Sequence, residues 1–502
     1  MLTRIRLFAF TIVCVLATSL YVIAEDQAQW GQRFSRNMIS DEKNLPESFD
    51  PATGKNIKWV VEIGTETHGT PMVAGGKVFI GTNNNRPRDP RQKGDRGVLM
   101  CFDEKDGSFL WQLVVPKITT SVYWDWTGAG ICSPATIEGD RAYIVTSHAE
   151  VMCLDINGMA NGNDGPFKDE GRQMVPAGQD AIEAGKTDAD IIWLFDLIKE
   201  CNVRQHDSAH CSILLDGQFL YVNTSNGVDD THRHIASPDA PCLIVIDKNT
   251  GRIVARDDEH IGPNIFHCTW SSPALAEVNG RKLIFYAAPN GIVYAFEPIR
   301  TVKDEIQKLQ KVWWFDMDPS SAKEKVHRFT ANRVESPSTI HAMPVFYKNR
   351  IYFAGGGDIW WGKRQSWLKC IDATKSGDVT KTAEIWSYPL ARHNLSSPAI
   401  YDGLIYVAES GRKIHCVDAE TGKPYWVHDV EGEMWASTLA ADGKVYVGTR
   451  RGEFITLAGG REKRVLSTIE MDSPISGTAT AANGVLYVVT QRRLYAVEKA
   501  GK

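Results

Sequence analysis

Residues 403–426 read GLIYVAESGRKIHCVDAETGKPYW, and this stretch decides the fold. It contains two short runs of apolar and β-branched residues, GLIYVAE at 403–409 and KIHCVDA at 413–419. A turn at Thr421-Gly422 then leads into a third run, which carries Trp426. Short runs of this composition, bounded by Gly and Asp, are typical of β-strands joined by turns. The segment therefore predicts successive strands and no helix.

The first run of this stretch recurs along the whole chain. Eight copies occupy residues 76–82, 140–146, 217–224, 281–288, 349–355, 403–409, 443–449 and 484–490. A second strand follows each copy. The third strand carries a tryptophan in most copies, namely Trp111, Trp193, Trp313, Trp386 and Trp426, whereas two copies have Ala255 and Leu466. Such a period predicts one large array of like units.

A further strand precedes each copy, and five of these strands share a proline, at Pro71, Pro134, Pro273, Pro344 and Pro398. Proline is tolerated at a sheet edge, where its missing N–H breaks no hydrogen-bond ladder. A four-stranded unit whose first strand is an edge describes a propeller blade, with that strand lining the central channel. The last copy lacks its fourth strand, which residues 56–63 with Trp59 can supply. We therefore predict an all-β, eight-bladed β-propeller of four-stranded antiparallel blades, its ring closed by an N-terminal strand.

The composition limits the class of protein. Of the 502 residues, 43% are hydrophobic and 23% are charged, and the net charge is −5. These values are typical of a packed soluble protein and exclude wholesale disorder or a multi-span membrane protein. Because no basic stretch is extended, we exclude nucleic acid as a partner.

The start of the chain has the pattern of an export signal. Two arginines precede an uncharged run at 7–24, which ends in a small-residue cleavage site. We predict a signal peptide at 1–24, an N-terminal extended arm at 25–56 and the propeller at 57–498. An uncleaved anchor is the alternative, because a run of this length can just span a bilayer. After signal removal we expect no membrane span, and a place in the periplasm or cell envelope.

The string from Asp418 to Trp426, echoed at 103–111 and 247–255, resembles the pyrroloquinoline quinone (PQQ) repeat. The resemblance covers roughly residues 57–498 and implies an eight-bladed propeller. Two functional classes share this repeat: quinoprotein dehydrogenases, and non-enzymatic relatives such as BamB, a scaffold of the outer-membrane barrel-assembly machinery. The whole chain resembles the exported PQQ-like propellers that are abundant in planctomycetes.

Several columns of the repeat predict structure. Cys101, Cys153, Cys370 and Cys416 stand where other copies have Ala, Val or Thr, which is typical of a tightly packed blade core. Acids two places further on are expected to form turns, and the repeated tryptophans to pack between blades. The other cysteines of the mature chain allow at most two disulfides among Cys132, Cys201, Cys211, Cys242 and Cys268.

Function is expected where the copies differ, on the loops that enter the first strands and join the second to the third. Both sets of loops surround one channel mouth. Aromatic rings, imidazoles and charged groups converging there predict a site for a polar, partly planar ligand. The candidate binding residues are His68, Trp124, Asp125, His210, Asn226, His267, Trp270, Trp360, Trp361, Arg364, His393 and Trp435.

Three histidines, His68, His210 and His341, recur at one depth in alternate blades. A shared metal would need all three close to one ion, and alternate blades are spread around the ring, so we predict no metal site.

We favour a non-enzymatic, BamB-like scaffold with an envelope protein, peptide or glycan partner and no cofactor. The alternative that the resemblance implies is a PQQ-dependent alcohol dehydrogenase with calcium. Trp435 or Trp361 would then be the stacking floor for the quinone, Asn226 would help to hold the cation, and Asp229 or Asp358 would act as base. The adjacent cysteine pair that such dehydrogenases commonly carry is absent from this sequence.

Overall fold

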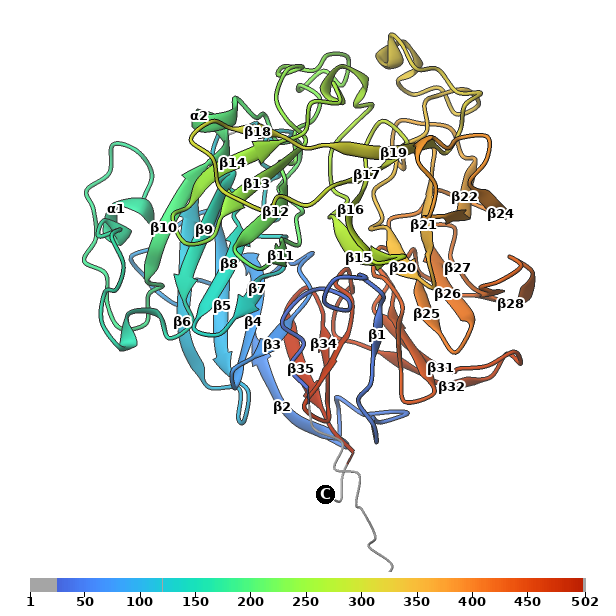
Figure 1. Cartoon of the computed structure of the whole chain (residues 1–502). Helices are drawn as coiled ribbons and strands as arrows, with labels where there is room; N and C mark the ends of the chain where they lie inside the picture. The colour runs from blue at the N-terminus through green and yellow to red at the C-terminus, as the bar shows by residue number, and fades with distance from the viewer. Residues whose placement is uncertain (1–24, 120, 500–502) are drawn as a thin grey trace, which may run out of the picture.

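The computed structural model describes residues 25–119 and 121–499, so the predicted signal peptide at 1–24 lies outside the described residues. Eight antiparallel sheets follow one another around a ring in chain order, from the blue blades to the red ones in Figure 1. The predicted eight-bladed propeller is confirmed. No helix within the described residues combines the length and the apolar character that crossing a membrane requires.

The first four blades, with strands given from the channel outward, have these bounds. Blade 1 contains β3 (Met72–Ala74), β4 (Lys77–Asn83), β5 (Arg96–Asp103) and β6 (Phe109–Pro116). Blade 2 contains β7 (Thr136–Glu138), β8 (Arg141–Val145), β9 (Glu150–Asp155) and β10 (Ile191–Asp196). Blade 3 contains β11 (Leu214–Asp216), β12 (Phe219–Asn223), β13 (Leu243–Asp247) and β14 (Arg252–Arg256). Blade 4 contains β15 (Ala274–Val278), β16 (Arg281–Ala287), β17 (Ile292–Phe296) and β19 (Lys311–Asp316).

The other four blades repeat this order. Blade 5 contains β20 (Val345–Tyr347), β21 (Arg350–Gly356), β22 (Ser366–Asp372) and β24 (Glu384–Leu390). Blade 6 contains β25 (Ala399–Tyr401), β26 (Leu404–Glu409), β27 (Lys413–Asp418) and β28 (Pro424–Asp429). Blade 7 contains β29 (Leu439–Ala441), β30 (Lys444–Gly448), β31 (Glu453–Ala458) and β32 (Val465–Glu470). Blade 8 contains β33 (Thr480–Ala482), β34 (Val485–Val489), β35 (Arg493–Val497) and β2 (Ile57–Glu62).

A few short elements decorate the blades. Parallel strands β1 (Ile39–Ser40), β18 (Gln307–Lys308) and β23 (Gly377–Asp378) extend blades 7, 3 and 4. The helices are α1 (Glu170–Gln173) and α2 (Leu197–Cys201), with single 3-10 turns at η1 (Gly158–Ala160), η2 (Gly262–Asn264) and η3 (Val326–Phe329). They lie in loops between strands and leave the ring to the sheets.

The N-terminal strand closes the ring as predicted. β2 pairs antiparallel with β35, and Trp59 stands opposite Ala496. Pairing of this kind removes the free edge that the last blade would otherwise expose.

The repeated tryptophans join each blade to the next. The indole N–H of Trp386, on the outer strand of blade 5, donates to the backbone carbonyl of Ala419 in blade 6 at 3.2 Å. Trp59, Trp111, Trp193, Trp313 and Trp426 donate in the same way to Glu104, Ile156, Lys248, Ala373 and Gly460. The tryptophan column therefore packs between blades, as predicted.

In one of the two units without tryptophan, the sequence alignment was wrong by one residue. Every outer strand has a bulge just before this column, so one residue there has no partner across the sheet. In blade 7 the bulge falls at Leu466, and Ser467 pairs with Thr456 in the tryptophan position. The assignment of Leu466 to this column is thus corrected to Ser467, whereas Ala255 pairs with Val245 as expected.

The column cysteines are blade-core residues, as predicted. Cys101, Cys153, Cys370 and Cys416 are buried and face Trp111, Trp193, Trp386 and Trp426 across their sheets. All nine cysteines in the described residues are free thiols, so none of the disulfides considered for Cys132, Cys201, Cys211, Cys242 and Cys268 is formed.

Residues 27–42 run around the inside of the ring and touch every blade. Backbone and side-chain hydrogen bonds join this segment to the innermost strand of each blade or to the residue just before it, at Val73, Ile137, Ile213, Leu275, Phe346, Ile400, Ala440 and Ala481. Innermost strands are edges whose N–H and C=O groups need partners. The segment supplies those partners and fills one end of the central channel.

We expect Gly422→Ala to lower the free energy of unfolding by about 3 kcal/mol. Gly422 has a φ of +71°, and a Cβ there would lie 2.6 Å from the Trp386 ring of the preceding blade. Gly403→Ala is the matched control, because Gly403 has a φ of +75° and open space around its Cβ position. Its cost should be about 1–2 kcal/mol, from backbone strain alone. Equal costs in urea titrations would show that the contact with Trp386 contributes nothing.

Candidate functional site

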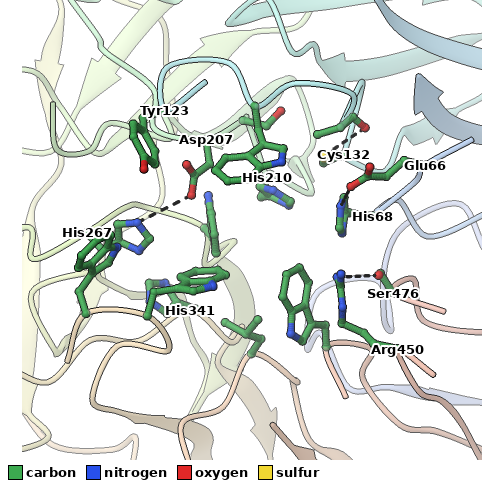
Figure 2. Close-up of a pocket in the computed structure, with 18 of the residues that line it drawn as sticks. Glu66, His68, Tyr123, Cys132, Asp207, His210, His267, His341, Arg450 and Ser476 are labelled. Atoms are coloured by element: carbon green, nitrogen blue, oxygen red, sulfur yellow. Dashed lines mark hydrogen bonds and ion pairs between the residues drawn. The ribbon is translucent and has the colours of Figure 1, made fainter. Parts of the chain in front are cut away.

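A cavity of about 380 Å³ lies at the channel mouth (Figure 2). Its walls come from the loops that precede the innermost strands, with His68, His210, Trp270 and Trp435, and from loops between second and third strands, with Trp360, Trp361 and Arg450. A cavity of this size, with mostly apolar walls and a few polar groups, is suited to a small molecule.

The segment that crosses the ring contributes to the cavity. Trp30 belongs to the inner segment 27–42 and also lines the cavity. The carbonyl of Trp30 accepts a hydrogen bond from Arg36 at 3.1 Å, which fixes the backbone beside the indole. We infer that Trp30 forms a floor, so the cavity opens toward the loops and is closed toward the channel.

Three of the lining indoles have hydrogen-bond donors without a partner. The Nε1–H groups of Trp30, Trp270 and Trp435 are buried and have no partner among the described residues. Buried polar groups are normally hydrogen-bonded, and each exception calls for a ligand or an ordered water. Each of these three donors therefore needs an acceptor oxygen, from an ordered water or from a bound molecule.

One wall combines a histidine, a tryptophan and an arginine. His68 stacks on Trp435 with ring centroids 5.6 Å apart, and the Arg450 guanidinium lies 3.7 Å from the same ring. The His68 Nε2 lies 2.9 Å from Glu66 Oε1 (Figure 2). Arg450 donates to Ser476 Oγ at 3.3 Å and places a positive charge at the cavity.

A second wall is built around Asp358, which is fully buried. Its Oδ1 accepts the backbone N–H groups of Trp360 and Trp361 at 2.9 and 2.7 Å. Its Oδ2 accepts from His267 Nδ1 at 3.0 Å and from His341 Nε2 at 3.3 Å. Burial alone would raise the pKa of Asp358, yet the two imidazoles hold it well below its usual range. The carboxylate orients both histidines and both tryptophans.

The imidazoles in and beside the cavity differ in the direction of their pKa shifts. Burial, with nearby His68 and His341, lowers the pKa of His210 to about 3, and burial with His267 lowers that of His232 to about 4. Burial and the neighbouring rings hold the pKa of His206 well below its usual range. For His267, burial acts downward, but Asp358 raises the pKa on balance. At neutral pH the first three are neutral, which is the form that accepts hydrogen bonds or binds metals.

Seven of the candidates from the sequence lie together. His68, His210, His267, Trp270, Trp360, Trp361 and Trp435 all line the cavity, and Asp358 holds three of them in place.

The remaining candidates lie elsewhere. Trp124 packs under Arg204, with 4.9 Å from the guanidinium carbon to the ring, and Asp125 is buried in an ion pair with Lys117 at 2.5 Å. Arg364 is exposed and His393 is half-buried, and neither belongs to the cavity lining; burial lowers the pKa of His393 to about 4.

Two further candidates organise a loop of blade 3. Asn226 accepts the backbone N–H of Arg204 at 3.1 Å and donates to the Ser237 carbonyl at 3.0 Å. Asp229 accepts the Thr231 hydroxyl in an exposed turn at 2.6 Å.

These contacts show whether the predicted residues are free to take the roles that PQQ chemistry requires. The ring of Trp435 is already in contact with His68 and Arg450. Trp361 packs on His232, with ring centroids 4.4 Å apart. Both oxygens of Asp358 are engaged, as are the side chains of Asn226 and Asp229. The residues predicted for a stacking floor, a cation ligand and a base therefore do not fit PQQ and calcium in those roles. We derive no catalytic step through that cofactor.

Several site residues were not among the sequence candidates. Trp30, Asp207, His232 and Arg450 all line the cavity. Trp30 lies outside the repeat, and His232 and Asp207 lie in loops of irregular length, so no column marks them. Arg450 directly follows the repeated strand at 443–449, and that position was the only available signal.

Comparisons with known proteins support the class. The family model described as outer membrane protein assembly factor BamB matches residues 364–502, from the third strand of blade 5 to the end. The structure is similar to BamB from Moraxella catarrhalis, with a TM-score of 0.54, 12% identity, and coverage of 88% of this chain and 98% of that one. It is also similar to a europium-containing methanol dehydrogenase, with a TM-score of 0.58, 12% identity, and coverage of 94% and 89%. The predicted propeller fold and its resemblance to PQQ-repeat proteins are thus confirmed.

Two curated relatives match short stretches. Quinohemoprotein alcohol dehydrogenase of Comamonas testosteroni is 28% identical over 108 residues, which is 19% of this chain and 15% of that enzyme. Quinohemoprotein alcohol dehydrogenase ADH IIB of Pseudomonas putida is 31% identical over 137 residues, which is 25% of this chain and 19% of that enzyme. The chain thus matches less than a fifth of the length of either enzyme.

Proposed function

We propose that this chain is an exported, non-enzymatic binding protein of the cell envelope. Its cavity would hold a small, oxygen-rich and partly planar ligand, either free or as part of a peptide, protein or glycan partner. The observation that carries the proposal is that three of the indoles lining the cavity, Trp30, Trp270 and Trp435, have unpartnered N–H donors. Flat aromatic walls favour a planar ligand face, and donors favour acceptor oxygens.

Charge supports the same ligand class. Arg450 contributes a positive charge to one wall, while Glu66 is already engaged with His68. A carboxylate or carbonyl of the ligand would meet Arg450 without displacing an existing ion pair. Likeness to BamB over most of the chain supports a scaffold, and the pattern at 1–24 supports export.

A PQQ-dependent oxidoreductase is the second candidate function. It is supported by the short matches to quinohemoprotein alcohol dehydrogenases and by the likeness to a methanol dehydrogenase. In this candidate the protein would bind PQQ with a metal ion and reduce an acceptor dye when alcohol is supplied.

The two candidates make different predictions in one set of titrations. We expect benzoate or cellobiose to bind saturably to the purified protein, measured by tryptophan fluorescence and calorimetry. Trp270→Phe keeps the ring but removes one unpartnered donor, so it should weaken binding about 10-fold. Trp314→Phe is the matched control, because Trp314 is half-buried on the outer strand β19 of blade 4. It should leave affinity unchanged.

The same protein is then incubated with PQQ and calcium chloride. Stoichiometric quinone absorbance with alcohol-dependent dye reduction would replace the binding-protein proposal with the oxidoreductase. Absence of saturable binding for benzoate and cellobiose, or equal losses in both tryptophan variants, would also overturn the proposal.

A further inference from the structure

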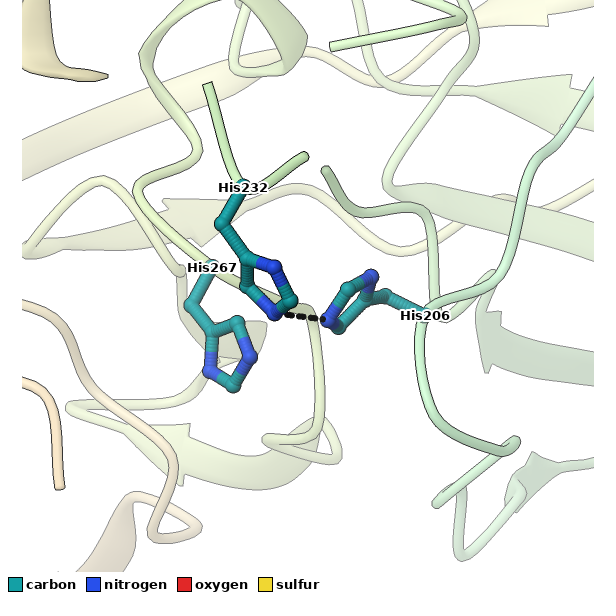
Figure 3. Close-up of side chains that lie close together, drawn as sticks. All are labelled: His206, His232 and His267. Carbon is teal, nitrogen blue, oxygen red and sulfur yellow. Dashed lines mark hydrogen bonds between the residues drawn. The ribbon is translucent and has the colours of Figure 1, made fainter. Parts of the chain in front are cut away.

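Three imidazoles converge at the edge of the cavity (Figure 3). They are His206 from the loop before β11, His232 from the loop between β12 and β13, and His267 from the loop before β15. One ring nitrogen of each lies within 4.8 Å of the others, and the Nε2 atoms of His206 and His232 are 3.1 Å apart. Two nitrogens bound to one tetrahedral zinc ion, each about 2.0–2.1 Å from it, are about 3.3 Å apart.

Hydrogen bonds on the far side of the His206 and His267 rings orient their other nitrogens toward the cluster. The Nδ1 of His206 donates to the Val228 carbonyl at 2.8 Å, so its Nε2 carries a lone pair. The Nδ1 of His267 donates to Asp358 at 3.0 Å, and its Nε2 faces the cluster. Metal-binding histidines almost always donate their second N–H to a carbonyl or carboxylate in this way.

A carboxylate completes the set. Asp207 Oδ1 lies 3.5 Å from His206 Nε2, and Asp207 Oδ2 lies 3.8 Å from His267 Nε2. Oδ1 is buried and has no hydrogen-bond partner among the described residues. The backbone holds Asp207 at a φ of +64°, and its N–H donates to the Tyr123 carbonyl at 2.7 Å.

Aromatic rings enclose the cluster. Tyr123 lies parallel to the His206 ring with centroids 6.0 Å apart, and Trp361 packs on His232 at 4.4 Å. Trp360 packs edge-on against His267 at 5.3 Å. These contacts restrict rotation of the imidazoles and limit access of water, which preorganises the nitrogens.

We propose that His206, His232, His267 and Asp207 form a binding site for one divalent first-row transition-metal ion, with zinc as the expected ion. Three imidazoles and one carboxylate suit zinc, whereas calcium and magnesium prefer oxygen ligands. Because Asp207, His232 and His267 also line the cavity, the ion would lie in the cavity wall. Metal binding here does not require the organic ligand of the proposed function.

The test begins with chelator-treated full-length mature protein. Zinc chloride is titrated and bound metal is counted by mass spectrometry of the buffer-exchanged protein, and cobalt chloride is titrated separately. We expect one zinc per chain and the intense visible absorption of tetrahedral cobalt. His206→Ala and His267→Ala should each weaken binding about 100-fold or more, and Asp358→Asn about 10–100-fold through the orientation of His267.

His210→Ala is the matched control. His210 is another imidazole of the same cavity, packed on Trp270 with centroids 4.8 Å apart, but it does not belong to the cluster. This variant should keep one zinc per chain. The proposal is overturned if the wild type retains less than half an equivalent of zinc, or binds calcium in preference to zinc. It is also overturned if the folded cluster variants bind zinc as tightly as His210→Ala, with folding judged by circular dichroism.

Discussion

Replacement of Arg36 by alanine is expected to lower the free energy of unfolding by about 3–5 kcal/mol. Arg36 is completely buried in the segment that crosses the ring. Its guanidinium donates to the Pro273 carbonyl at 2.8 Å, to the Ser212 carbonyl and hydroxyl at 2.8 and 2.9 Å, and to the Trp30 carbonyl. Truncation removes the donor and leaves these acceptors without partners, which is costly in a buried setting. Urea titration followed by circular dichroism measures the change.

Arg36→Ala should change the cavity as well as the stability of the fold. Burial lowers the pKa of Arg36 to about 9, so the guanidinium stays charged at neutral pH and keeps all its donors. Loss of its hydrogen bond to the Trp30 carbonyl should allow Trp30, which forms the floor of the cavity, to move. We therefore expect Arg36→Ala to weaken ligand binding at temperatures where the ring is still folded.

Arg33→Ala is the matched control for this prediction. Arg33 lies in the same segment but is exposed, and its nearest carboxylate, on Glu138, is 3.8 Å away. Exposed pairs of this kind contribute about 0–1 kcal/mol. If Arg33→Ala and Arg36→Ala shift the urea midpoint equally, residues 27–42 do not anchor the blades through Arg36.

The sequence could predict the ring because each blade repeats the same local contacts. Trp386 reaches the turn of the next blade, and Cys370 faces Trp386 across its sheet, so both occupy columns that recur at a fixed place. Closure by Trp59 followed from the same column, since the last copy lacked one strand. In blade 7 the tryptophan column was assigned one residue too early, to Leu466 and not to Ser467. A bulge causes this error because it inserts a residue without changing the composition of the strand.

The path of residues 27–42 could not be predicted from the repeat. This segment contacts eight strands that are far apart in sequence, through bonds to backbone groups that any residue can supply. Its single strong signal is Arg36, whose charge suggests exposure although the residue is fully buried. The burial of Arg36 depends on four specific hydrogen-bond acceptors, and the composition of the sequence does not show that these acceptors surround it.

The candidate site was predicted in outline but not in its pairings. The depth of His68, His210 and His341 in the repeat correctly brought them to one cavity. Which imidazoles meet depends on loop lengths, and the cluster that forms is His206, His232 and His267. We predicted no metal site because the alternate blades of His68, His210 and His341 are spread around the ring, whereas this cluster comes from two neighbouring blades.

The floor of the cavity limits the faces on which this propeller can bind a partner. An open channel offers two faces to a partner, but here the segment carrying Trp30 fills one end. Recognition is thereby confined to the loops of one face, where the cavity and the histidine cluster share Asp207 and His267. A ligand oxygen that coordinated the ion would couple the two sites, and zinc would then raise the affinity of the ligand.

Replacement of Trp59 by alanine should open the ring at its closure. Trp59 is 8% exposed on β2, and its indole donates to Glu104 at 3.0 Å. Truncation of a buried tryptophan costs about 3–5 kcal/mol. β2 is joined to blade 8 by no direct chain connection, so the loss should release β2 locally and expose the edge of β35. Amides of β35 should then exchange with deuterium at least about 100-fold faster, as measured by mass spectrometry.

Trp426→Ala separates this local effect from simple loss of packing. Trp426 occupies the same column in blade 6, is also 8% exposed and donates to Gly460 at the same distance of 3.0 Å. Its strand β28 is linked directly along the chain to β27, so the sheet should stay paired although global stability falls by a similar amount. An exposed strand edge promotes association, so only Trp59→Ala should also form concentration-dependent oligomers. Equal protection of β35 in the two variants would show that ring closure does not depend on the Trp59 contact.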